Sequence, residues 1–235
     1  MAEMLQPKNQ NLRIEKTEYR LVFEKTGRAR YISHLDLMRC FQRLFKRAGA
    51  PLWYTQGFNP HAYLMFPLAL PLGTSSSVEI LDIALTEPLG YDELCEKVNA
   101  CAPEGLRLVS AAAPVMKHTE IAFAEYEVSF EQDGTEGSVL GQRFSDFLAQ
   151  EKIEVEKRTK KRGVNLVDIR PHICLLSLSS EGAHADAGLR LPAGSEFNLN
   201  TNVVMEAFES FMGSSLDRIC TKRTKILTKS LENFI

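Results

Sequence analysis

The chain has 235 residues, of which 44% are hydrophobic and 25% are charged, and its formal net charge is −2. These bulk values are typical of a globular protein. The five cysteines are scattered without a C-x-x-C pair, which argues against a disulfide framework and a thiolate zinc site. No apolar run approaches the ~20 residues of a membrane span, so we expect a cytoplasmic protein without a membrane partner.

The first half predicts six elements in chain order. After a polar arm at residues 1–17, residues 19–27 alternate as a strand does, and Ser33 with Asp36 marks a helix start. Apolar positions then recur at spacings of three and four up to Ala48, which predicts an amphipathic helix. An extended segment breaks at residues 57–60, a strand follows at 78–85, a second helix at 91–102 and a strand at 106–115.

The second half repeats this order. Strands are predicted at residues 124–131, 153–159 and 174–180, helices at 138–150 and 201–212, and a last strand at 215–228, with residues 184–192 as a candidate for a further strand. A repeated βαββαβ order predicts an α+β fold of two tandem ferredoxin-like units with antiparallel sheets, covering residues 18–117 and 118–235. A single domain with one shared sheet is the alternative.

Charge is distributed unevenly along the chain. Residues 19–61 hold eight Lys/Arg against two acids, whereas residues 79–136 hold thirteen acids against three bases. Arg28 and Arg30 precede the first helix, and Arg39 and Arg43 lie on its polar face. Because the N-terminus of a helix attracts anions, this region predicts phosphate binding, with a solvated helix face as the alternative.

A second basic cluster lies at residues 157–172. Lys160 and Lys161 fall in a predicted hairpin tip, and Arg170 falls in the returning segment. Such bases neutralise phosphates without reading sequence. Four aromatic residues in the first half could stack on unpaired RNA bases, although core burial is the more common role of such residues; they are Trp53, Tyr54, Phe58 and Tyr63.

The histidines raise the question of chemistry. His34, Asp36, His61 and His172 could converge on a metal, but no two of them have a diagnostic ligand spacing. A positioned histidine could also act as an acid or base in RNA cleavage. The common nucleotide-binding and hydrolase motifs are missing, so we expect no cofactor, no metal and no catalytic residue.

Four short motifs carry a family resemblance. They are SHLDL at residues 33–37, GFNPH at 57–61, PLG at 71–73 and DIRP at 168–171. With these motifs the chain resembles the radical SAM-linked protein family, a bacterial domain of unknown function (DUF2344). The resemblance implies a separately encoded radical SAM protein as partner. The chain has no C-x-x-x-C-x-x-C for a radical SAM cluster, so it would be the accessory half.

We therefore expect a non-catalytic accessory protein that binds structured RNA, tRNA or rRNA, or another polyanion. Alternatives are an RNA-processing or RNA-modifying enzyme using His34, Asp36 and His61, with or without metal, and a protein-docking scaffold. The expected polyanion contacts are Arg28, Arg30, Arg39, Arg43, Lys160, Lys161 and Arg170. The expected pocket residues are His34, Asp36, Asn59 and His61. The sequence leaves the oligomeric state open.

Overall fold

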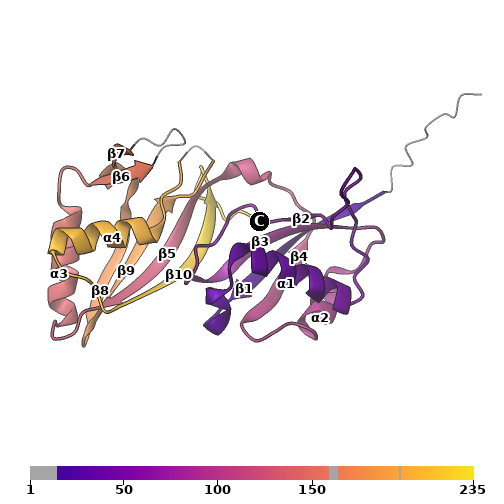
Figure 1. The fold of residues 1–235 in the computed structure, drawn as a ribbon, viewed down its shortest axis with the longest axis horizontal. Coiled ribbons are helices and arrows are strands. Elements are labelled where there is room, and N and C mark those ends of the chain that lie inside the picture. Colours follow the sequence, from indigo (N-terminus) through magenta and orange to yellow (C-terminus); the bar gives the residue numbers. More distant parts are fainter. Residues whose placement is uncertain (1–14, 159–163, 196) are drawn as a thin grey trace, which may run out of the picture.

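The structure, a computed structural model, describes residues 15–158, 164–195 and 197–235. It is a mixed α+β fold in which one large, mostly antiparallel sheet is packed against α-helices (Figure 1). None of the helices in these ranges is long and apolar enough to cross a membrane. The predicted arm at residues 1–17 lies mostly outside the described residues.

The first half runs from the first strand to residue 112. Its elements are β1 (Thr17–Lys25), the 3-10 helix η1 (Gly27–Tyr31), α1 (His34–Arg47), β2 (Leu64–Met65), β3 (Ser75–Leu85), α2 (Tyr91–Asn99) and β4 (Leu106–Ala112). The predicted order of elements is therefore present, although the third element is reduced to the two residues of β2.

The second half follows after residues 113–117. Its elements are η2 (His118–Glu120), β5 (Ile121–Glu131), α3 (Gly137–Leu148), β6 (Glu154–Arg158), β7 (Val164–Asp168), η3 (Arg170–His172), β8 (Cys174–Glu181), β9 (His184–Pro192), α4 (Thr201–Met212) and β10 (Arg218–Thr228). The strand predicted at 153–159 is β6, which pairs with β7 in a separate two-stranded sheet.

The two halves share one sheet. Its strand order is β4-β1-β3-β10-β5-β9-β8, and β2 pairs with β3 beside this path. Neighbouring strands are antiparallel except at the seam, where β3 and β10 run parallel through the pairs Ser75–Lys222 and Ser76–Arg223. The structure therefore has the single shared sheet that was the alternative to two separate sheets.

Helix α1 forms for local reasons. Ser33 is its N-cap, and its hydroxyl oxygen accepts a hydrogen bond from the backbone N–H of Asp36. Gly49, just after the helix, has a φ of +70°, which a glycine adopts at low cost. The apolar stripe predicted from the sequence is the buried face, with Leu37, Phe41, Leu44 and Phe45 in the core. The polar face is therefore turned to solvent.

Each half has its own hydrophobic core. The first is made by residues 19–108, with α1 and α2 packed on β1, β3 and β4. The second is built mainly by α3 and α4 on β5 and β9, and its centre is a set of four aromatic rings, Phe130, Phe144, Phe147 and Phe208. In Figure 1, α1 and α4 lie in front of the strands of their respective halves.

The seam between the halves contains buried charge. Arg223 of β10 is 1% exposed and donates to Glu79 of β3 at 2.9 Å, to the Ala69 carbonyl at 2.9 Å and to the Tyr126 hydroxyl at 3.3 Å. Lys25 is also buried and donates to the Ile32 carbonyl at 2.8 Å; burial lowers the pKa of its ammonium group. A buried arginine held by a carboxylate, a carbonyl and a hydroxyl fixes how the two halves meet.

Candidate functional site

The exposed face of α1 forms one side of a groove. Arg39, Arg43 and Arg47 line it together with Asp36 and Cys40, and its volume is about 400 Å³. The opposite side comes from the chain just after α2, at Cys101 and Pro103. Because residues four apart on a helix share a face, the three guanidinium groups form a row along α1.

Two of these arginines are free to meet a ligand. Arg39 pairs with Asp36 at 3.0 Å, and both side chains are more than half exposed, so the pair is weak. Arg43 and Arg47 are exposed and have no ion pair among the residues that the structure describes. Hydrogen bonds from Ser33 and then Arg39 lower the pKa of Asp36. The groove therefore carries a net positive charge at neutral pH.

Cys40, one of the two cysteines that line the groove, is not an activated nucleophile. Burial raises the pKa of the Cys40 thiol, although Arg43 and Arg47 act in the opposite direction. A thiol with a raised pKa stays protonated near neutral pH and is a poor nucleophile. The chemistry that this groove offers is charge pairing by arginine.

The bases before α1 lie apart from this row. Arg28 is exposed on η1. Arg30 lies over the ring of Tyr31, with its guanidinium carbon 4.8 Å from the ring centre, and donates to the Tyr31 hydroxyl at 2.7 Å. Neither residue lines the groove.

The predicted pocket residues have different contacts. The ring of His34 packs edge-on against Phe66, with the ring centres 5.2 Å apart. His61 closes the 55–61 loop: its Nδ1 lies 3.1 Å from both the Thr55 hydroxyl and the Asn59 carbonyl. Asp36 alone of the four lines the groove. In the described part of the chain, no three His, Cys, Asp or Glu residues could hold a metal together.

The 55–61 loop presents one aromatic ring to solvent. Phe58 is 110% exposed and Tyr54 54%, whereas Trp53 and Tyr63 are half-buried and pack edge-on against each other. The Lys16 ammonium lies 5.1 Å from the Trp53 ring centre and 5.0 Å from that of Tyr63. Of the four aromatic residues considered for base stacking, Phe58 and Tyr54 are the accessible ones.

The charged side chains of the DIRP segment are hydrogen-bonded to backbone groups of the second half. Asp168 accepts backbone N–H groups from Ile153 at 2.9 Å and Arg170 at 3.0 Å. The Arg170 guanidinium donates to the Leu148 carbonyl at the end of α3 and to the Ile173 carbonyl at 3.4 Å. These contacts fasten the base of the β6–β7 hairpin to α3. Lys160 and Lys161 lie outside the described residues.

Asp168→Ala should lower stability in a pH-dependent way. The two backbone hydrogen bonds lower the pKa of Asp168 below its ordinary value of about 3.9. A lowered pKa contributes stability that is present above the unfolded-state pKa and lost as the pH falls through the folded-state pKa. In urea unfolding, the variant should be less stable than wild type at pH 7, and the difference should narrow below about pH 4. Asp146→Ala, at an exposed site on α3, is the control; a gap that does not change with pH would contradict the argument.

Sequence reasoning identified Arg39 and Arg43 but left Arg47, Cys101 and Pro103 out of the site. The signal for Arg47 was present, because it continues the four-residue spacing of the other two arginines. Cys101 and Pro103 have no such signal, since only the packing of α2 beside α1 brings them there.

The comparisons with known proteins give a family and a number of distant structures. Residues 18–205 match the family described as "Uncharacterized protein conserved in bacteria (DUF2344)". No curated protein matches the chain. A chain of "Crystal Structure of a Cbf5-Nop10-Gar1 Complex" aligns with a TM-score of 0.47 and 10% identity, over 88% of this chain and 48% of that chain. This chain thus spans about half the length of that structural neighbour.

The second structure is "Crystal Structure of an Unknown Protein from Galdieria sulphuraria". It aligns with a TM-score of 0.26 and 15% identity, over 89% of this chain and 99% of that chain. Neither likeness is close enough to support an argument about fold or function. The α1 groove therefore has to be interpreted from its own residues.

Proposed function

The chain belongs to the DUF2344 family of proteins conserved in bacteria, and we propose that it is a cytoplasmic, non-catalytic accessory protein that binds structured RNA on α1. The observation that carries the RNA-binding proposal is the row of Arg39, Arg43 and Arg47 along one groove. Arginine pairs with phosphate through a planar fork of donors, and such contacts supply most of the sequence-independent affinity for nucleic acids.

The other parts of the proposal have separate support. The SHLDL, GFNPH and DIRP motifs support a separately encoded radical SAM enzyme as the partner that acts on the bound RNA. The strand orders β4-β1-β3-β2 and β10-β5-β9-β8, each antiparallel and each covered by two helices, support two ferredoxin-like units. The RNA groove would then belong to the helical face of the first unit.

Arg39→Glu combined with Arg43→Glu tests the RNA-binding proposal. We expect at least about a tenfold loss of affinity for bulk tRNA in a filter assay, because two phosphate contacts become repulsive. In a plot of log affinity against log salt concentration, the slope should become shallower by roughly 1.4–1.8, because two phosphate contacts are lost. The melting temperature should hardly change, since both side chains are exposed.

The matched control is Arg107→Glu combined with Arg143→Glu. Both residues are exposed, on β4 and α3, and the change in net charge is the same. This control should retain tRNA binding nearly at the wild-type level. An equal loss of tRNA affinity in the two double variants would show that only net charge matters, and would contradict a site on α1. Wild-type tRNA affinity in the α1 variant would contradict it as well.

A further inference from the structure

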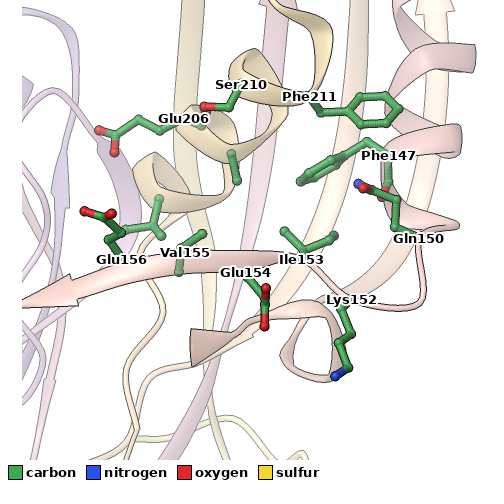
Figure 2. Close-up of a pocket in the computed structure, with 12 residues that line it drawn as sticks. Phe147, Gln150, Lys152, Ile153, Glu154, Val155, Glu156, Glu206, Ser210 and Phe211 are labelled. Carbon is green, nitrogen blue, oxygen red and sulfur yellow. The ribbon is translucent and has the colours of Figure 1, made fainter. Parts of the chain in front are cut away.

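A second groove lies at the other end of the molecule, between the helices of the second half and β6. Its volume is about 490 Å³. Figure 2 shows Ile153 and Val155 rising toward α4, with Phe147 entering from α3. Val203, Ala207 and Phe211 of α4 complete the apolar surface, and Phe211 is 43% exposed. This size is in the range of ligand-binding clefts, about 300–1,000 Å³.

The rim of this groove is acidic. Glu154, Glu156 and Glu206 line it, together with a single basic residue, Lys152. All four side chains are exposed, and among the side chains that the structure describes, which do not include those of residues 157–164, none of the three carboxylates has an ion-pair partner. Carboxylates repel phosphate, so this surface selects against RNA and favours a cationic ligand.

The groove also runs along the edge of a strand. Residues 154–156 of β6 line it without interruption, as do residues 152 and 153 just before the strand. Consecutive residues of a strand point to opposite faces, so a groove that contacts all of them passes the edge of β6 and not one face. Within the described chain β6 pairs with β7 alone, which leaves its other edge with unpaired backbone donors and acceptors.

A two-stranded sheet of this kind gains from a third strand. Isolated two-stranded hairpins are marginally stable in water, and three or more strands are usual. Extended peptides add to such edges through main-chain hydrogen bonds, while pockets for alternate side chains give specificity. The apolar surface between β6 and α4 is such a pocket, and the carboxylates of its rim are available to basic side chains of an added strand.

We propose that this groove binds an extended, basic segment of a partner protein, which adds as a strand to the free edge of β6. Its alternate apolar side chains contact Val203, Ala207 and Phe211, and its Lys or Arg side chains pair with the carboxylates of the rim. This site is separate from the α1 groove and does not rest on RNA binding there.

The test uses a fluorescein-labelled heptapeptide, acetyl-Lys-Leu-Arg-Val-Lys-Leu-Arg-amide, with the full-length protein. We expect saturable binding by fluorescence polarisation at low salt, with NMR shifts at residues 152–156 and on α4. A peptide with Glu in place of every Lys and Arg should not bind. Two further peptides carry N-methyl groups on the amides of one edge or the other, and at least one should lose binding because strand addition needs those donors.

Charge-reversal variants of the protein test whether the peptide binds at the β6 groove. Glu156→Lys with Glu206→Lys should weaken peptide binding on the order of tenfold, because two attractive charges become repulsive. Glu87→Lys with Glu96→Lys changes the net charge equally at exposed positions of the first half and should bind nearly as wild type does. Failure of the basic peptide to bind, undiminished binding by both N-methylated peptides, or equal affinity of the two double variants would overturn the proposal.

Discussion

Glu79→Ala is expected to lower the free energy of unfolding by about 3–5 kcal/mol, because it leaves a buried charge without its partner. The carboxylate is 2% exposed and accepts from Arg223 at 2.9 and 3.1 Å. Without it the Arg223 guanidinium keeps the Ala69 carbonyl and the Tyr126 hydroxyl, neither of which carries an opposite charge. Urea unfolding followed by circular dichroism measures the loss.

A double variant separates the charge from the packing. Glu79→Leu with Arg223→Met removes both charges and keeps comparable volume, so it should recover a large part of the lost stability. Glu96→Ala, at an exposed position of α2, should change stability by less than about 0.5 kcal/mol. A Glu79→Ala variant as stable as the Glu96→Ala control would show that the seam does not depend on this ion pair.

Phe208→Ala should lower the free energy of unfolding as much as Glu79→Ala does, for a different reason. Phe208 is fully buried on α4, and its ring packs against Phe130, Phe144 and Phe147 at centre distances of 5.6, 4.9 and 5.5 Å. Removing a buried phenyl ring leaves a cavity and costs about 3–5 kcal/mol. Thermal and urea unfolding should both report the loss.

Phe211→Ala is the matched control, one turn further along the same helix. Phe211 is 43% exposed, so less apolar area returns to water and we expect a cost of at most about 1.5 kcal/mol. Phe211→Ala should also weaken binding of the basic heptapeptide, because Phe211 lines the β6 groove. Phe208 does not line that groove, so Phe208→Ala removes no contact with the peptide. Equal destabilisation by the two variants would contradict the assignment of Phe208 to the centre of the core.

Local patterns predicted the individual elements well. The Ser33 cap and the apolar stripe identified α1 almost to the residue, and residues 201–212 are the observed span of α4. These elements are specified by spacing and capping within a few residues of sequence. The extended segment before residues 57–60 forms no regular strand, since Leu52 and Tyr54 make isolated bridges, and the strand β2 lies beyond the turn at Leu64 and Met65.

Long-range pairing could not be predicted in the same way. Glu79 belongs to a stretch noted for its acidic charge and Arg223 to the last predicted strand, and nothing near either residue in sequence indicates that they meet in the interior. The β3–β10 contact joins positions that are far apart in the sequence, and no local pattern marks them as partners. For the same reason, the sequence suggested that His34 and His61 share a pocket, whereas the structure gives them Phe66 and Thr55 as separate partners.

The seam also has a consequence for the order of folding. The core of the first half uses residues 19–108 alone, so it can form while the rest of the chain is still being synthesised. The parallel pairing of Ser75 with Lys222 spans most of the chain, and contacts of such high sequence separation form late. During that interval the edge of β3 and the Glu79 carboxylate lack β10 as their partner, so we expect the nascent first half to be prone to aggregation through this unpaired edge.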